Sequence, residues 1–160
     1  MKKIVVYKSQ TGFTRKYGEW IAAKLGCECI PVQEAKTERL ENCDLIIYGG
    51  NVCAGAVAGL PDIYQRISQM SGKQMVIFGT GATKMEESER IAEIQKRNEE
   101  LLKTSQIPFF YFSGGINFEK QKFFGKMILK MMKMKESFDL SEEGNIEPLL
   151  AKVSELEGAL

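Results

Sequence analysis

Five short apolar segments recur along the chain, and each has the length of a single strand. The third and fourth segments, 44–50 and 74–78, are nearly continuous apolar runs. Central strands of a parallel sheet have this pattern when both of their faces are covered. Helical patterns separate the segments, which are 4–7, 27–32, 44–50, 74–78 and 108–112. Strands that alternate with helices predict an α/β fold with a parallel sheet and right-handed crossovers.

Apolar residues at helical spacing predict the helices between and after these strands. The helices are expected over 14–25, 60–70, 86–102 and 146–156. Gly26 ends the first helix and Pro61 begins the second. The polar segment 33–42 is expected to connect at the surface. The third helix should pack through a stripe made of Ile91, Ile94, Leu101 and Leu102. We expect one domain spanning 1–160, with no repeat and no linker.

The segment 4–14 has the composition of an anion-binding turn. A strand that feeds a helix in this way directs several backbone N–H groups at one point, and the helix N-terminus adds partial positive charge there. Ser9, Thr11 and Thr14 add hydroxyl donors. Gly12 allows a close approach of the backbone. The alternative is an ordinary connection in which Thr14 lies near the N-cap of the helix.

The phosphate that suits this turn is a monoester. No lysine or arginine lies between Lys8 and Arg15, so neutral dipoles would hold the group. A transferred phosphoryl group needs a lysine and a metal ion. The chain has no G-x-x-x-x-G-K-[ST] motif, which excludes a P-loop. It also lacks the acidic cluster of response regulators in the first loop.

The spacing of the opening segment resembles the signature of the flavodoxin family. The residues that carry the resemblance are Val5, Val6, Tyr7, Ser9, Gly12, Thr14, Gly18 and Ile21, with Gly18 where the family usually has alanine. The resemblance implies a flavodoxin-like three-layer αβα sandwich with a five-stranded parallel sheet in the order 2-1-3-4-5. It also implies flavin mononucleotide (FMN) as a noncovalent cofactor. The phosphate would be held by Ser9, Gln10, Thr11, Gly12, Phe13 and Thr14.

Two further loops of small residues follow the third and fourth strands. Ligands of such sheets bind beyond the carboxyl ends of the strands, at the switch point of the strand order. With the phosphate at 9–14, the flavin ring should lie between 50–58 and 79–84, and neither loop contains an aromatic residue. One face of the ring would therefore be open to a flat partner. The expected ring-lining residues are Asn51, Val52, Cys53, Ala54, Gly55, Thr80, Gly81, Ala82 and Thr83.

Composition restricts the chemistry that the side chains can supply. Histidine is absent, which excludes a Ser-His-Asp triad and a histidine zinc site. No metal site and no nucleic-acid partner is expected, and no side chain is assigned as a catalytic acid or base. The four cysteines should be reduced and mostly buried. Without a signal peptide or an apolar span, we expect a cytoplasmic protein that at most rests on the inner face of the cell membrane.

The segment 113–139 is expected to be an insertion after the fifth strand. A glycine-rich turn precedes a two-sided helical pattern over 118–138, with phenylalanine and methionine on one face. Six lysines and two glutamates lie between 119 and 136, although the whole chain carries a net charge of only +1. Lys122, Lys126 and Lys130 are candidates to contact an acidic substrate or lipid headgroups. The alternative is a helix that packs on the core and exposes its lysines to solvent.

A narrower resemblance is carried by this insertion. Phe123-Phe124 and the run 126–133 are similar to flavodoxin-domain proteins related to menaquinone-dependent protoporphyrinogen IX dehydrogenase. The resemblance implies electron transfer between a porphyrinogen and a quinone, and peripheral membrane contact. We therefore favour an FMN-dependent oxidoreductase with a small-molecule, quinone or porphyrin-type partner. A flavodoxin that carries electrons between redox proteins is the alternative, and a flavin-free interaction protein is the third possibility.

Overall fold

The computed structural model of the chain describes residues 1–116 and 138–159. Its main sheet has the order β2-β1-β3-β5-β6, and all four pairings along this path are parallel. The strands are β1 (Lys3–Lys8), β2 (Glu28–Pro31), β3 (Leu45–Cys53), β5 (Gln74–Gly81) and β6 (Phe109–Ser113). This is the flavodoxin-like order 2-1-3-4-5 expected from the sequence, which is therefore confirmed.

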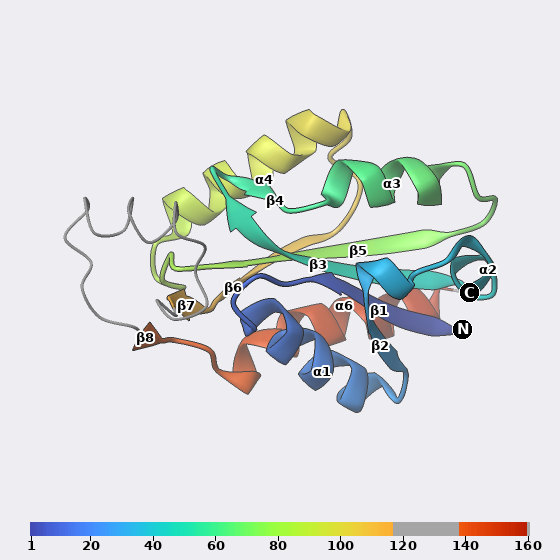
Figure 1. Cartoon of the computed structure of the whole chain (residues 1–160), viewed down its shortest axis with the longest axis horizontal. Helices are drawn as coiled ribbons and strands as arrows, with labels where there is room; N and C mark the ends of the chain where they lie inside the picture. The colour runs from blue at the N-terminus through green and yellow to red at the C-terminus, as the bar shows by residue number, and fades with distance from the viewer. Residues whose placement is uncertain (117–137, 160) are drawn as a thin grey trace.

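Helices cover both faces of this sheet (Figure 1). Helices α1 (Phe13–Leu25) and α6 (Glu147–Gly158) lie on one face, and α3 (Leu60–Ser68) and α4 (Ser88–Leu102) lie on the other. Shorter elements connect them: η1 (Val32–Glu34), α2 (Thr37–Glu41) and η2 (Glu143–Ile146). The structure is thus the three-layer αβα sandwich that was expected. The segment 33–42 is more ordered than predicted, because Leu40 of α2 is buried in the core.

The central strands bury alternate side chains in two separate cores. In β1, Ile4 and Val6 face the core beneath α3, whereas Val5 faces the core beneath α1 and α6. β3 and β5 alternate in the same way, for example with Ile77 in the first core and Phe78 in the second. Successive side chains of a strand point to opposite faces. A continuous apolar run is therefore what a strand covered on both faces requires.

The stripe predicted for α4 is partly wrong. Leu102 is buried, but Leu101 is 39% exposed. Adjacent residues of a helix lie about 100° apart around its axis, so only one of this pair can face the sheet. The position that precedes Leu102 by one turn is Asn98, which is buried. The inward face of α4 therefore includes a polar side chain where the sequence suggested only apolar ones.

The loop of small residues predicted after the third strand is instead largely a hairpin. β3 continues to Cys53, and β4 (Ala56–Val57) pairs with it antiparallel, with Cys53 opposite Ala56. The two residues between them, Ala54 and Gly55, have φ values of 50° and 80°. Positive φ at both central residues is the backbone of a type I′ turn, whose twist matches that of paired strands. Small residues at 54 and 55 thus form a tight turn.

Two adjacent glycines in β3 provide the space for close packing. A Cβ on Gly49 would lie 2.0 Å from Cζ of Phe78, and one on Gly50 would lie 2.7 Å from the carbonyl oxygen of Ala58. The first position lets the Phe78 ring lie against the strand. The second lets the chain after β4 return over β3, where the Tyr48 hydroxyl donates to the Ala58 carbonyl at 2.6 Å.

A short antiparallel ladder lies at the two ends of the segment that the sequence predicts as an insertion. β7 (Gly115–Ile116) pairs with β8 (Phe138–Asp139), and the N–H of Leu140 donates to the carbonyl of Gly114 at 2.6 Å. Phe138, expected to end a helix, is therefore in a strand. The rest of that expected helix, with Lys122, Lys126 and Lys130, lies outside the described residues.

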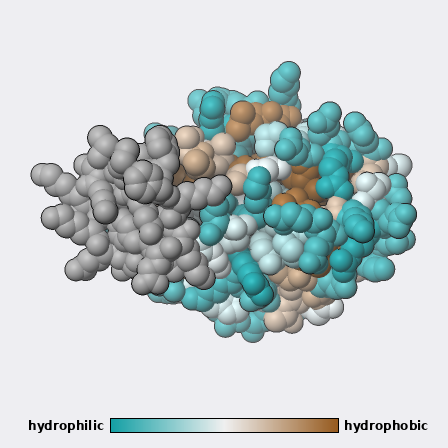
Figure 2. Space-filling model, viewed as in Figure 1, coloured by the Kyte–Doolittle hydropathy of each residue, from teal (hydrophilic) through white to brown (hydrophobic). Residues whose placement is uncertain are grey.

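The described surface is largely polar. Figure 2 shows hydrophilic side chains over most of the described part of this face, with smaller apolar areas between them. Within 1–116 and 138–159, no helix combines the length and the apolar character that crossing a bilayer requires.

Gly18 offers a test of packing between α1 and β2. A Cβ there would lie 3.1 Å from Sγ of Cys29, which is a tight contact. Alanine is favoured over glycine inside a helix by about 1 kcal/mol. We expect Gly18→Ala to leave the free energy of unfolding unchanged or lower, and to raise it by about 1 kcal/mol when Cys29→Ala is also present. Urea denaturation of the four proteins measures this coupling, and equal effects in both backgrounds would contradict it.

Candidate functional site

Three loops meet at the carboxyl ends of β1, β3 and β5. We name them the phosphate loop (9–14), the hairpin loop (51–58) and the third loop (79–85). Side chains join the first loop to the other two. The amide of Asn51 donates to Oε1 of Gln10 at 3.4 Å, and the hydroxyls of Thr14 and Thr80 are 2.7 Å apart. The structure therefore brings together all three segments that the sequence analysis assigned to one site.

The phosphate loop turns at a glycine that precedes α1. Gly12 has φ 95°, and its N–H donates to Oγ of Ser9 at 3.1 Å. The hydrogen bonding of the helix begins when Lys16 N–H donates to the Gly12 carbonyl at 3.0 Å. The N–H groups of 13–15 therefore have no acceptor within the helix, as at every helix start. Such N–H groups form an anion site when they are reachable.

The basic side chains at the start of α1 are engaged elsewhere. Arg15 pairs with Glu19 one turn along the helix at 2.8 Å, which raises the pKa of its guanidinium. Lys16 pairs with Asp139 at 3.1 Å and donates to the Ser141 hydroxyl at 2.8 Å. The donors that converge in the phosphate loop are accordingly neutral backbone and hydroxyl groups, as the sequence suggested.

Phe13 lies close to the start of the β7–β8 ladder. A Cβ on Gly114 would be 3.0 Å from Cβ of Phe13, and one on Gly115 would be 3.0 Å from Cζ of the same ring. Lys16 donates to Asp139, which lies opposite Gly115 on the other strand of the ladder. Both strands of the ladder are thus attached to the first turn of α1, next to the phosphate loop.

The hairpin loop is fastened from behind by Asn98. This side chain is 1% exposed and makes three hydrogen bonds. Its Oδ1 accepts from the N–H of Val57 at 2.8 Å, and its Nδ2 donates to the carbonyl of Gly55 at 3.0 Å and to that of Ile94 at 2.7 Å. Buried polar groups that are fully paired favour one arrangement of the chain. Asn98 therefore fixes the hairpin loop on α4.

Asn51 carries an unpaired acceptor into the junction of the loops. Its Oδ1 is buried and has no hydrogen-bond partner among the described residues. An unpaired buried acceptor costs about 1–3 kcal/mol, so a ligand that donates to it would bind more tightly. The flavin ring has an N–H that could make such a bond. The residues of this junction therefore fit the cofactor that the sequence resemblance implies.

The third loop is held by the end of β6. The carbonyl of Thr83 accepts from the Tyr111 hydroxyl at 2.9 Å and from the Ser113 hydroxyl at 2.7 Å. The Gly114 N–H donates to the Gly81 carbonyl at 2.7 Å. Burial raises the pKa of the Tyr111 phenol to about 12, so it stays a donor across the physiological range. The end of β6 thus holds this loop through the backbone carbonyls of Gly81 and Thr83.

Tyr17 ties the same region to the end of the chain. Its hydroxyl donates to the Ser113 carbonyl and accepts from the Glu142 N–H at 3.2 Å and from the Asn145 amide at 3.0 Å. Burial raises the pKa of the phenol, although the bonds from Asn145 and Glu142 oppose this shift. The ring also stacks on Phe112, with the centroids 5.0 Å apart. Tyr17 is therefore a structural anchor behind the site.

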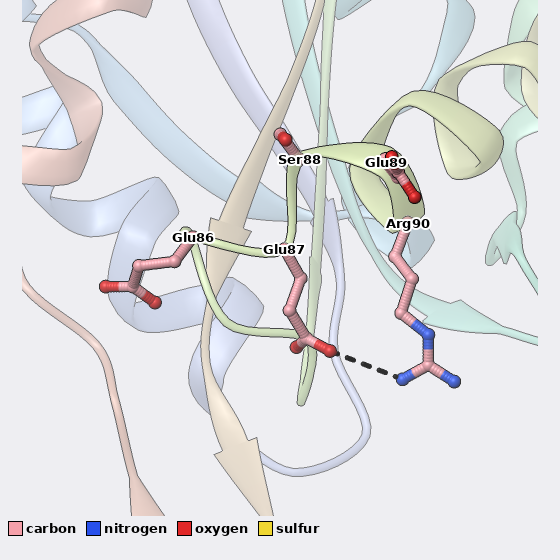
Figure 3. Close-up of a pocket in the computed structure, with 5 residues that line it drawn as sticks. All are labelled: Glu86, Glu87, Ser88, Glu89 and Arg90. Atoms are coloured by element: carbon pink, nitrogen blue, oxygen red, sulfur yellow. Dashed lines mark ion pairs between the residues drawn. The ribbon is translucent and has the colours of Figure 1, made fainter.

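A separate hollow lies at the start of α4 (Figure 3). It has a volume of about 340 Å³ and is lined by Glu86, Glu87, Ser88, Glu89 and Arg90. Glu87 and Arg90 form an ion pair at 3.6 Å, and Glu86 points away from both. With three carboxylates against one guanidinium, this hollow disfavours a phosphate. It contains none of the residues assigned to the cofactor.

The cysteines differ in accessibility. Cys43 is buried, Cys27 and Cys29 are partly buried, and Cys53 in the hairpin loop is exposed. Burial raises the pKa of Cys29 to about 12 and also raises those of Cys27 and Cys43. The expectation of mostly buried cysteines is wrong for Cys53, because it lies at the end of β3, where the strand extends beyond the buried part of the sheet.

Asn98 is the residue that sequence reasoning missed. The sequence does show that Asn98 lies one helical turn from both Ile94 and Leu102, and therefore on the same apolar face of the helix. Ser113 and Tyr17 were also missed, since their partners are backbone carbonyls far along the chain. Such partners leave no pattern in a sequence.

The role of Asn98 in the hairpin loop can be measured by substitution. We expect Asn98→Leu to lower the free energy of unfolding by about 2–3 kcal/mol, because it leaves the Val57 N–H and the Gly55 carbonyl without partners. The control is Gln95→Leu, which removes only a bond to Glu99 one turn away and should cost less than about 0.5 kcal/mol. Equal losses in urea denaturation would argue against a special role for Asn98.

The turn at 54–55 can be improved by one substitution. Ala54 has φ 50°, which costs a residue other than glycine, asparagine or aspartate roughly 1 kcal/mol. Asn-Gly is the preferred pair for a type I′ turn. Ala54→Asn should therefore raise the melting temperature, whereas Gly55→Ala should lower it. A fall with both substitutions in differential scanning calorimetry would contradict this assignment of the turn.

Comparison with known proteins agrees with this architecture. Among solved structures, a flavodoxin from the domain Archaea has 19% identity and a TM-score of 0.50, with 84% of this chain and 94% of that chain covered. The flavodoxin, WrbA-like protein from Agrobacterium tumefaciens has 14% identity and the same TM-score, with 84% and 98% covered. The Trp repressor binding protein from Bacillus subtilis has 20% identity and a TM-score of 0.50, with 71% and 83% covered.

These likenesses concern the fold, and the sequence itself decides the family. No curated protein matches the chain. The family model described as "Flavodoxin domain" matches residues 4–141, which includes the phosphate loop, the hairpin loop and the third loop. The chain belongs to the flavodoxin family.

Proposed function

We propose that the chain binds FMN at the junction of the three loops and acts as an oxidoreductase. The observation that carries the proposal is the convergence of neutral donors in the phosphate loop beside the unpaired Oδ1 of Asn51. FMN supplies the electron transfer when it is bound, and the protein supplies binding, orientation and electrostatics. Membership of the flavodoxin family supports the choice of a flavin.

Each loop has a distinct task in this proposal. The phosphate is held by Ser9, Gln10, Thr11, Gly12, Phe13 and Thr14, through backbone N–H groups and hydroxyls. The ring lies against residues of the hairpin loop and the third loop, which are Asn51, Val52, Cys53, Ala54, Gly55, Thr80, Gly81, Ala82 and Thr83. Because Asn98 and Ser113 hold these loops from behind, the ring would meet a preorganised surface.

FMN binding is tested on the purified chain. We expect FMN added to the apoprotein to give a complex with a perturbed visible absorption spectrum and quenched flavin fluorescence. Riboflavin, which lacks the phosphate, should bind more weakly, because it cannot use the donors of the phosphate loop. A protein that leaves the spectrum of added FMN unchanged would refute the proposal and favour a flavin-free interaction protein.

The exposed thiol of Cys53 reports where the ring lies. The thiolate is the reacting form, and burial raises the pKa of the other cysteines, so we expect Cys53 to react first with a maleimide. Saturating FMN should slow this reaction. Labelling of Cys27 after denaturation is the internal reference. If FMN binds and the rate at Cys53 does not change, the ring does not lie on the hairpin loop.

An enzyme acting on a small molecule is favoured over an electron carrier. The hairpin loop and the third loop contain no aromatic residue at 51–58 or 79–84, which leaves the ring accessible to a flat substrate. The finer proposal is a dehydrogenase that oxidises a porphyrinogen and reduces a quinone, supported by the resemblance of the insertion. Loss of flavin absorption as fluorescent porphyrin appears would support it. Rapid reduction by a ferredoxin-type reductase without porphyrinogen turnover would favour the carrier.

The lysines of the insertion belong to this proposal as contacts for an acidic substrate or a lipid surface. If these lysines face lipid, the combined substitutions Lys122→Glu, Lys126→Glu and Lys130→Glu should reduce the fraction of protein that sediments with anionic liposomes. Unchanged sedimentation together with a raised KM for porphyrinogen would assign them to the substrate.

A further inference from the structure

Two buried hydroxyls meet between the phosphate loop and the third loop. Thr14, in the first turn of α1, is 1% exposed, and Thr80, near the end of β5, is 2% exposed. Their Oγ1 atoms are 2.7 Å apart, which is the ordinary length of an O–H···O hydrogen bond, and either oxygen can be the donor. Thr80 is among the residues proposed to line the ring, and its hydroxyl is directed at Thr14 in α1.

The direction of this hydrogen bond decides what Thr14 offers to a ligand. A hydroxyl has one proton and two acceptor lone pairs. Only one of the two protons can lie between Thr14 and Thr80. If Thr14 donates, its remaining lone pair faces any anion in the phosphate loop, and the two repel. If Thr80 donates, Thr14 keeps its proton for the anion.

We infer that Thr80 is a positioning residue for the phosphate, which acts by donating its proton to Thr14. The inference rests on the proposed function, because it requires the FMN phosphate in the phosphate loop. The bond that Thr14 accepts also polarises its own O–H group and strengthens the bond that it donates. Thr80 thereby contributes to recognition of a group that it does not touch.

The distinguishing measurement compares FMN with riboflavin, which has the same ring and no phosphate. Thr80→Val keeps the shape of the side chain and removes the hydroxyl. We expect its affinity for FMN to fall about five- to tenfold, the value of a typical hydrogen bond, with no change for riboflavin. Thr80→Ser restores the donor and should restore FMN affinity. Fluorescence titration measures both ligands, and Thr104→Val, remote from the loops, controls for the exchange of threonine for valine.

A double-mutant cycle tests whether Thr80 acts through Thr14. If it does, Thr80→Val should cause no further loss of FMN affinity in a Thr14→Val protein. Losses that add, or an equal loss for riboflavin, would overturn the inference. If thermal unfolding shows that Thr80→Val does not fold, Thr80→Ala removes the same hydroxyl with less steric demand, and the same comparisons apply.

The outcomes separate this inference from the proposed function. A wild-type chain that binds no FMN refutes the proposed function, and the inference fails with it. A wild-type chain that binds FMN more tightly than riboflavin, together with an unchanged Thr80→Val, refutes the inference alone. If Thr80→Val weakens FMN binding when Thr14 is present and has no effect in the Thr14→Val protein, both the proposed function and the inference are supported.

Discussion

Burial of both faces of the central strands is the constraint on which the rest of the structure depends. β1, β3 and β5 send alternate side chains into two cores, so neither face can be left without helices. Parallel pairing then requires each connection to cross from one end of the sheet to the other. All loops that follow the strands consequently meet at one edge. The strand order alone therefore brings the loops of the candidate site together, whatever side chains they carry.

The fold could be predicted from the sequence because its signals are local. Apolar runs over 44–50 and 74–78 and helical spacing over 14–25 are each visible in a short window. The errors occurred where tertiary contacts decide. Ala54 and Gly55 suggested a loop, yet pairing of Cys53 with Ala56 extended the sheet through a tight turn. Leu101 and Leu102 were both predicted in the core, but the orientation of α4 can bury only one of them.

The sequence could propose which loops form the candidate site, but not the contacts that hold those loops together. The spacing from Ser9 to Thr14 indicated the phosphate loop, and the strand order indicated which loops would join it. The side chains that hold those loops cannot be identified from a short stretch of sequence, because their partners are far along the chain. Asn98 bonds to backbone groups more than 40 positions away, and Thr80 bonds to a hydroxyl 66 positions away. Side chains that support a site in this way become apparent only when the chain is folded.

The ladder of β7 and β8 makes the insertion separable from the sandwich. Gly115 lies opposite Asp139, so the chain leaves and re-enters the domain at neighbouring points. The intervening length can therefore be shortened, extended or exchanged without moving β6 or α6. Any change in that length would begin and end at the same pair of hydrogen-bonded strands, which lie beside the first turn of α1.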